Sequence, residues 1–418
     1  MTHSSELYDR ALKKSPGGVS SPVRAYKPNP LFIESGKGSK IRDADGNEYI
    51  DYCLAYGPMI AGHSNDYVLN AVKNRLGKGT LYGAPSEIEL ELIELISERI
   101  PSAEMVRLAV SGAEATMHAI RVARGFTGRD GIVKMNGGYH GAHDAVMANK
   151  DKGYRSCPGS PGIPPEAVKN TFNAEYNDIE SLTEVIEAES PACVILEPVM
   201  GNIGVILPEK GYLEEVRKVT EETGTLLIFD EVITGFRLSE GGAQKYYGVT
   251  PDMTTCAKIM GGGFSGSAFM GKKEIMENIA PAGKIYAAGT YAGNPVSAAA
   301  GKAQLEYMTG KYDALNKRGS DLINSLKDFM EDSGTEGCVN GVGSMLSVFF
   351  GVDSVTNGTQ ATGTNRETFN ALFRHMLDNG IYLAPSALEG WFLSTEHSEA
   401  DITATAEAFD SFVKREKK

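Results

Sequence analysis

Short apolar segments alternate with helical patterns in the middle of this 418-residue chain, and this alternation limits the possible folds most strongly. Three runs have the length and composition of buried strands: residues 131–135, 192–196 and 225–229. Helical spacing of apolar residues appears between them, at 179–188 and 211–223. Strands that alternate with helices are typical of an α/β fold with a mostly parallel central sheet. We therefore expect this fold class.

The length of the chain predicts more than one domain. The N-terminal part is rich in Gly, Pro and Asp, and the part that follows a Gly/Asn/Pro-rich stretch at 289–295 is of mixed character. We expect an N-terminal segment that packs with a small domain, a large domain, and a C-terminal small α+β domain. Their expected bounds are 1–60, 61–300 and 301–418.

One helix can be placed from its own residues. Apolar side chains recur every four residues between Glu87 and Arg99, which predicts a helix there. Ser86 and Glu89 have the spacing of a capping box at its start.

Composition argues against several classes of partner. The net charge is −13 and the Lys and Arg residues form no basic stripe, so we expect neither nucleic acid nor an anionic membrane surface as a partner. The longest apolar runs are strand-sized, and the first residues lack the apolar region of a signal peptide. The five cysteines are far apart and form no CxxC pair, which predicts neither a disulfide framework nor a zinc site. A reducing, cytoplasmic location fits best.

Asp230 and Lys258 are the strongest candidates for chemistry. Asp230 follows the strand predicted at 225–229, and ligands bind outside the carboxyl ends of parallel strands. On that evidence alone Asp230 could equally cap a helix or pair with an arginine. Lys258 lies between apolar neighbours and three glycines, where desolvation would lower its pKa and favour a nucleophile over a surface lysine. The two residues together favour a catalytic lysine.

The segment Gly261–Gly266 formally matches the GxGxxG pattern of dinucleotide-binding folds. Such a site needs a preceding strand and an acidic residue about 20 positions further on. Residues 253–258 are a poor strand by composition, and 282–288 contain no acid. We therefore reject that interpretation, and expect the glycines to let the backbone pass close to a ligand.

Ser111, Gly112 and Ala113 open a predicted helix that continues through Arg124. A Ser-Gly turn at a helix N-terminus presents free N–H groups and the positive end of the helix dipole, which suit a phosphate. Taken alone, simple N-capping by Ser111 explains the same pattern.

Tyr139 follows the strand predicted at 131–135, so it is expected at the same edge of the sheet as Asp230. Its ring could stack on a planar ligand or belong to the core. His140 and His143 have the spacing of metal ligands, but no carboxylate or cysteine pattern accompanies them. We expect no metal site.

Five motifs in order carry a resemblance that covers nearly the whole chain. They are residues 16–25, 56–60, 229–237, 288–295 and 382–386. Together the motifs resemble those of the class III aminotransferases, which are fold-type I pyridoxal-phosphate enzymes. The resemblance implies a mostly parallel sheet in a large cofactor-binding domain, with a smaller α+β domain.

The resemblance also implies roles around the cofactor, pyridoxal or pyridoxamine 5′-phosphate. Lys258 matches the lysine that forms the Schiff base and moves protons. Asp230 matches the acid that keeps the pyridine nitrogen protonated. Tyr139 matches the aromatic residue stacked on the ring, Val232 the apolar residue behind it, and Asn202 the amide near the phenolic oxygen.

Further matches concern the phosphate, the substrate and the subunit boundary. The Ser111 turn matches the phosphate-binding turn, and Thr290 matches a residue that reaches the phosphate from the neighbouring subunit. This implies a homodimer with active sites at its interface. Ser21 and Arg24 match the pair that holds a substrate carboxylate, with Glu389 as an acidic neighbour.

The activity implied is the transfer of an amino group within glutamate-1-semialdehyde to give 5-aminolevulinate, a tetrapyrrole precursor. A class III aminotransferase that uses another amino acid, such as a β-amino acid, with a keto-acid acceptor is the alternative. A catalytically silent cofactor-binding protein is a third possibility, against which the retention of Lys258 and Asp230 counts.

Four departures from the family pattern bear on the substrate and on a mobile lid. Tyr56 replaces a usual tryptophan, and Asn136 replaces an acidic residue. Residues 265–267 replace a Pro-Val-Gly stretch, and the expected lid at 150–165 lacks its usual Ala-Gly-Ser-Gly pattern. The residues of the cofactor site are unaffected.

Overall fold

The computed structural model describes residues 2–416, and the chain divides into two compact units. The first unit contains Met1–Asn65, Asp313–Val355 and Gly363–Lys418. The second unit contains Asp66–Tyr312 and Thr356–Thr362. The boundaries expected at 60/61 and 300/301 lie at 65/66 and 312/313 instead. The physical reason is that helix α10 (Pro295–Met308) packs against α2 (Asp66–Leu76) and α3 (Glu87–Arg99), and so belongs to the second unit.

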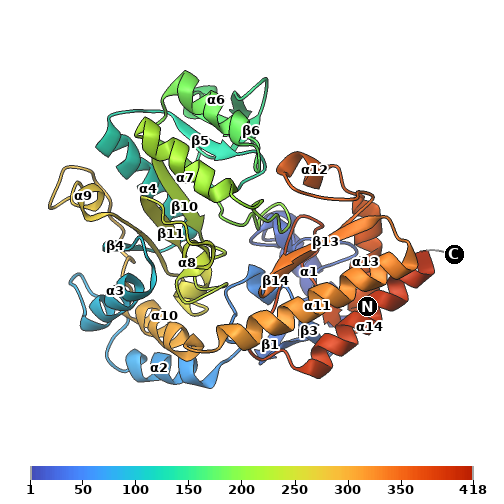
Figure 1. Cartoon of the computed structure of the whole chain (residues 1–418). Helices are drawn as coiled ribbons and strands as arrows, with labels where there is room; N and C mark the ends of the chain where they lie inside the picture. Colours follow the sequence, from blue (N-terminus) through green and yellow to red (C-terminus); the bar gives the residue numbers. More distant parts are fainter. Residues whose placement is uncertain (1, 417–418) are drawn as a thin grey trace. The chain divides into compact units, whose positions relative to one another are not determined.

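The second unit is built on a seven-stranded sheet, which confirms the α/β fold class (Figure 1). Its strands, in spatial order, are β4 (Met105–Ala109), β12 (Ser267–Gly271), β11 (Met253–Cys256), β10 (Leu226–Glu231), β9 (Cys193–Leu196), β5 (Ile132–Met135) and β8 (Thr171–Ala174). The pairs from β11 to β8 are all parallel, while β12 runs antiparallel to both of its neighbours. The sheet is therefore mostly parallel, as expected.

Helices cover the strands. Helices α4 (Gly112–Thr127), α6 (Ile179–Glu189) and α7 (Tyr212–Thr223) pack against strands of the sheet (Figure 1). Leu226 and Ile228 of β10 share a core cluster with Ala115 and Ala119 of α4. Side chains alternate between the two faces of a strand, so Asp230 continues the row that faces α4.

Strand β11 corrects one expectation, because residues 253–256 were taken to be a poor strand. They form a fully buried strand between β10 and β12. Thr254 and Thr255 are β-branched and suit a strand, and their hydroxyl groups find partners inside the protein. The Thr254 hydroxyl bonds the Gln244 amide at 3.0 Å, and the Thr255 hydroxyl donates to Asp230. The chain then enters a short 3₁₀ segment and an antiparallel strand, so no dinucleotide-type βαβ unit follows.

Helix α3 has the bounds predicted from its periodicity. Ser86 stands at the N-cap position, but its side chain makes no capping hydrogen bond and its hydroxyl is buried. The capping box expected with Glu89 is therefore not formed.

The first unit contains two small sheets. One consists of β1 (Ile33–Lys37), β2 (Lys40–Asp43), β3 (Glu48–Asp51) and β15 (Ile381–Tyr382). The other consists of β13 (Gly337–Val342), β14 (Met345–Phe350) and β16 (Trp391–Phe392). Because β15 pairs with β3, this sheet contains segments from both the N-terminal and the C-terminal part of the sequence. Helices α13 (Arg366–Asp378) and α14 (Glu399–Glu416) pack on each other.

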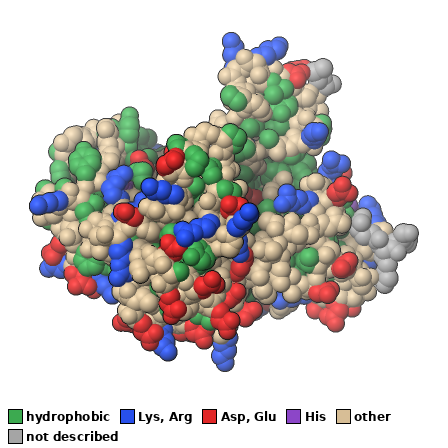
Figure 2. Space-filling model, turned by 90° about the horizontal axis from the view of Figure 1, so that it is seen from above, with side chains coloured by type: hydrophobic (Ala, Val, Ile, Leu, Met, Phe, Trp, Pro, Cys, Tyr) green, Lys and Arg blue, Asp and Glu red, His purple; other side chains and the backbone are tan. Residues whose placement is uncertain are grey.

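The other helices and strands complete the two units. They are α1 (His3–Leu12), β6 (Ala148–Lys150), β7 (Ser156–Pro158), α5 (Pro165–Val168), α8 (Gly242–Tyr247), α9 (Lys273–Met276), α11 (Tyr312–Ser333) and α12 (Gly358–Thr362). The β6–β7 hairpin occupies much of the expected lid. Within residues 2–416, no helix is both long and apolar enough to cross a membrane. On the face seen in Figure 2, Lys and Arg side chains are interspersed with Asp and Glu side chains.

Candidate active site

A cavity of about 290 Å³ opens in the second unit at the carboxyl ends of β5 and β10 and the N-terminus of α4. Parallel strands place their ligand sites at this edge. The residues expected around the cofactor meet here, apart from Thr290. They are Ser111, Gly112, Ala113, Tyr139, Asn202, Asp230, Val232 and Lys258.

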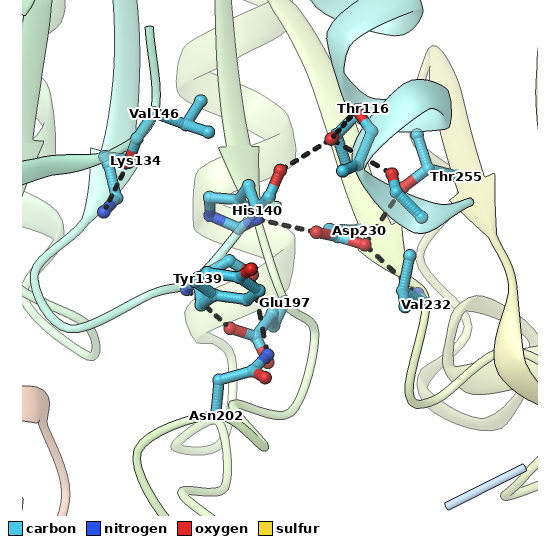
Figure 3. Close-up of polar contacts among 12 residues, drawn as sticks. Thr116, Lys134, Tyr139, His140, Val146, Glu197, Asn202, Asp230, Val232 and Thr255 are labelled. Atoms are coloured by element: carbon cyan, nitrogen blue, oxygen red, sulfur yellow. Dashed lines mark hydrogen bonds and ion pairs between the residues drawn. The ribbon is translucent and has the colours of Figure 1, made fainter. Parts of the chain in front are cut away.

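Asp230 is held rigidly at the end of β10. Its Oδ1 accepts hydrogen bonds from the Thr255 hydroxyl at 2.9 Å and from the Val232 N–H at 3.1 Å. Its Oδ2 lies 2.7 Å from Nδ1 of His140 (Figure 3). The carboxylate is 3% exposed. Because both oxygens are tied to the protein, Asp230 presents a fixed negative charge to the cavity.

His140 contacts Asp230, and sequence analysis did not predict this contact. Its side chain is fully buried against Asp230, and the Thr116 hydroxyl donates to its carbonyl at 2.6 Å. His143 is half-buried, and this desolvation lowers its pKa to about 4. Among the described residues, no group of three or more His, Cys, Asp or Glu could hold a metal ion. His140 follows β5 and Asp230 ends β10, and the two strands lie close together in the sheet with only β9 between them. The order of residues along the chain does not reveal this proximity.

The sequence at the N-terminus of α4 allowed two interpretations, N-capping by Ser111 and the binding of a phosphate. Ser111 is the N-cap, and its hydroxyl accepts from the Glu114 N–H at 3.3 Å. The Glu114 carboxylate in turn accepts from the Val110 N–H at 2.8 Å. The other N–H groups of the first turn have no partner inside the helix and point toward its N-terminal end. Ser111 therefore caps a helix whose first turn can also bind an anion.

Lys258 begins the 3₁₀ segment Lys258–Gly261 that follows β11, with φ of 46°. This left-handed backbone is unusual for a residue other than glycine. The glycines after it were expected to approach a ligand, but only Gly266 lines the cavity. Gly262 approaches α10 instead: a Cβ there would lie 2.3 Å from the Ala300 carbonyl oxygen. On the helix side, a Cβ at Gly301 would lie 2.1 Å from the Met260 carbonyl oxygen.

Tyr139 and Asn202 stand together on one side of the cavity (Figure 3). Tyr139 is 49% exposed, so it is not a core residue. Glu197 lies between the two and bonds Asn202 Nδ2 at 2.9 Å. Sequence analysis missed Glu197, although it directly follows an apolar strand, the same signal that identified Asp230.

The donor set fits the cofactor that the resemblance implies. A lysine, a fixed carboxylate, an anion-binding helix end and a half-exposed aromatic ring border one cavity. These groups match an aldehyde, a ring nitrogen, a phosphate and a flat ring, respectively.

A family model described as aminotransferase class-III matches residues 22–396. The chain belongs to this family. Two curated relatives are the glutamate-1-semialdehyde 2,1-aminomutases of Archaeoglobus fulgidus and Methanococcoides burtonii. The first is 52% identical over 409 residues, which cover 97% of this chain and 98% of the relative. The second is 51% identical over 412 residues, with 97% of each covered. The solved structure of an omega-transaminase from Sphaerobacter thermophilus matches with a TM-score of 0.93 and 31% identity, covering 99% and 97% of the two chains.

The other predicted site residues of this class III aminotransferase lie outside the cavity. Thr290 is an exposed residue between α9 and α10, and it does not line the cavity. Ser21, Arg24 and Glu389 belong to the first unit. Arg24 and Glu389 both act on the Tyr56 hydroxyl, Arg24 lowering and Glu389 raising its pKa, while burial raises it most. These two residues therefore share one neighbourhood, which contains a cavity of about 460 Å³ lined in part by Arg24 and Tyr56.

Side chains at three of the positions that depart from the family pattern make hydrogen bonds with nearby residues. The Tyr56 hydroxyl donates to the Val23 carbonyl at 2.7 Å. The Asn136 amide donates to Glu175 and to Thr359, both at 3.1 Å. The Ser267 hydroxyl donates to the Ser111 carbonyl at 2.8 Å and so braces the anion-binding turn of this aminotransferase.

Proposed function

We propose that this class III aminotransferase is an aminomutase that converts glutamate-1-semialdehyde to 5-aminolevulinate with pyridoxal or pyridoxamine 5′-phosphate. The observation that carries the proposal is 52% identity to a curated aminomutase along 97% of this chain. Lys258 and Asp230 at one cavity support it, because a silent binding protein needs neither.

The cofactor, when bound, supplies an electron-withdrawing ring and an exchangeable amine. The protein supplies position and protons. Asp230 holds a proton at the ring nitrogen, and its three bonds keep its carboxylate in place for that task. Lys258 takes a proton from the substrate carbon and returns it. The first turn of α4 would hold the phosphate, and Tyr139 and Val232 would hold the ring.

We assign the substrate carboxylate to Ser21 and Arg24, with Glu389 setting the charge beside the guanidinium. Thr290, exposed in the single chain, is assigned to the phosphate of a partner copy, so the working enzyme is a homodimer. The five cysteines are free, three of them buried, which suits a reducing cytoplasm.

A transaminase is the second candidate. The fold of the Sphaerobacter omega-transaminase matches with a TM-score of 0.93, and Tyr56 and Asn136 depart from the expected pattern. An aminotransferase that accepts a β-amino acid and a keto acid would use the same cofactor site.

A turnover assay separates the two activities. An aminomutase leaves the number of amino groups in its substrate unchanged. Protein loaded with pyridoxamine phosphate should therefore convert glutamate-1-semialdehyde to 5-aminolevulinate repeatedly, with no amino donor or keto-acid acceptor added. Lys258→Ala protein should make none. If the wild-type protein stopped after about one product per site and resumed only with a keto acid or amino donor, the transaminase would replace the aminomutase.

The cofactor assignment has its own test. Borohydride reduction of the pyridoxal-phosphate form, followed by peptide mapping, should place the pyridoxyl group on Lys258. A label on another lysine would show that Lys258 was assigned wrongly.

A further inference from the structure

Glu197 is a buried carboxylate at the end of β9 for which the proposed mechanism has no use. It is 3% exposed and lines the cavity. Its Oε1 accepts from the Tyr139 N–H at 3.3 Å. Its Oε2 accepts from the Gly201 N–H at 2.8 Å and from Asn202 Nδ2 at 2.9 Å. One side chain thus ties together the two residues on the Tyr139 side of the cavity (Figure 3).

The contacts of Glu197 are those of an ionised group. Burial raises the pKa of Glu197 most and Asp230 raises it too, while His140 and the N–H groups of Gly201 and Tyr139 lower it. In each of the three hydrogen bonds Glu197 accepts, and a protonated carboxyl would need a further acceptor for its own hydrogen. A buried charge is costly, and three N–H donors offset that cost at this position.

An acceptor-only carboxylate fixes the orientation of the Asn202 amide. Nδ2, and not Oδ1, must face Glu197. Nδ2 also has a long contact of 3.5 Å with the Tyr139 carbonyl oxygen. Because that contact is weak, Nδ2 can donate its second hydrogen to a ligand oxygen in the cavity instead. If residue 197 could also donate, the Asn202 amide could turn over and offer its oxygen instead.

The same carboxylate fixes the backbone from which the Tyr139 ring projects. Tyr139 lies in the loop after β5, and its half-exposed ring borders the cavity. The bond from its N–H to Glu197 joins this loop to the end of β9. The position of the ring and the orientation of the Asn202 amide therefore depend on one group.

We propose that Glu197 is a positioning residue that sets the Tyr139 ring and the Asn202 amide as one unit against the cofactor ring. The inference rests on the cofactor site of the proposed function but not on the identity of the substrate. It predicts that the charge of Glu197 and its reach to both Tyr139 and Asn202 determine how the cofactor is held.

The test compares Glu197→Gln with Glu231→Gln in full-length protein. Both replacements keep the shape of a buried glutamate. Glu231 is 0% exposed and accepts from Thr234 and Gln244, but it does not line the cavity. Affinity for pyridoxamine phosphate is measured by calorimetric titration of the apo-protein. The induced circular dichroism of bound pyridoxal phosphate reports on how asymmetrically the ring is held.

Both variants should unfold at a lower temperature than wild-type protein, because each weakens buried hydrogen bonds. Only Glu197→Gln should bind pyridoxamine phosphate about tenfold more weakly, equal to about 1.4 kcal/mol, and lose induced dichroism per bound cofactor. Wild-type affinity and dichroism in Glu197→Gln would overturn the inference alone. A wild-type protein that bound neither form of the cofactor would overturn the proposed function.

If Glu197→Gln does not fold, Glu197→Asp serves instead. Aspartate keeps the charge but is too short to reach both Tyr139 and Asn202. Weaker cofactor binding and reduced dichroism are again expected, and wild-type values in folded Glu197→Asp would contradict the inference.

Discussion

Each unit of the chain contains a histidine–aspartate pair with the same 2.7 Å separation. In the second unit Nδ1 of His140 meets Oδ2 of Asp230, and in the first unit Nε2 of His63 meets Oδ2 of Asp51. The surroundings differ. Asp230 borders the cavity that contains Lys258, whereas Asp51 and His63 border the cavity lined in part by Arg24 and Tyr56, and Oδ1 of Asp51 accepts the N–H groups of Cys53 and Leu54, both at 2.9 Å.

The difference shows that the pair itself does not define function. Asp51 uses its carboxylate to close a backbone turn after β3, and His63 completes its hydrogen bonding. Asp230 uses the same geometry to hold its carboxylate beside Lys258. In the proposed mechanism, a catalytic pair differs from a structural one in the group that its carboxylate faces.

The largest effect expected is on activity in Asp230→Asn. The amide can keep the bonds from Thr255 and Val232, but it cannot hold a proton on a ring nitrogen. Turnover should fall on the order of 10³-fold, the scale of losing a key electrostatic contact, while pyridoxamine phosphate still binds. Asp51→Asn is the matched control and should lose far less activity per folded molecule. If both variants lost activity equally, the two histidine–aspartate pairs would not differ in function.

Asp51→Ala should affect stability instead. It leaves two buried N–H groups and His63 without their acceptor, which should cost about 3 kcal/mol. The only tryptophan, Trp391, is buried in the same unit, so its fluorescence during urea unfolding reports on that unit. The midpoint should fall in Asp51→Ala, and Asp230→Ala should leave the tryptophan transition near its wild-type position.

His397 sharpens the comparison, because its hydrogen bonds go to Ser394 rather than to a carboxylate. Burial lowers its pKa to about 4, below the ordinary value of 6.5. Between pH 6.5 and 4 the unfolded chain therefore binds a proton that the folded chain does not, and stability falls as pH falls. The loss should approach about 3 kcal/mol near pH 4, seen in the Trp391 transition.

The matched variant is His397→Asn, whose side-chain oxygen can still accept from Ser394 but does not titrate. Its stability should depend less on pH over the same range. A pH dependence equal to that of the wild-type protein would mean that other groups control it.

The smallest effect is expected at His140. His140→Leu removes one contact that orients Asp230 and should lower turnover about tenfold, equal to about 1.4 kcal/mol. His140→Asn can place a nitrogen near the position of Nδ1 and should recover most of the activity. If both variants were as inactive as Asp230→Asn, His140 would do more than orient its partner.

Sequence analysis anticipated the parts of the fold that depend on local patterns. Strands β5, β9 and β10 lie largely in the mostly apolar segments predicted at 131–135, 192–196 and 225–229, and α3 has a clear helical period. Strand β11 was missed because two threonines make it look polar, and their burial depends on partners such as Gln244 from other elements.

The site was predictable where a single position carries the signal, as at Lys258 and Asp230. His140 was weighed only as a metal ligand, because its partner lies 90 positions away in the sequence. Glu197 follows a strand just as Asp230 does, but no lysine downstream drew attention to it. The domain boundaries shifted because α10 packs on α2, a contact between distant segments.

The close approach of the Lys258 loop to α10 has a consequence for mutational scanning. Gly262 and Gly301 meet backbone carbonyls across this contact, with no space for a side chain at either position. In a saturation library, both glycines should tolerate almost no replacement and should score like catalytic residues, although neither lines the cavity. Attempts to broaden the substrate range would do better to vary Tyr56 and Asn136, and to leave this interlocked backbone unchanged.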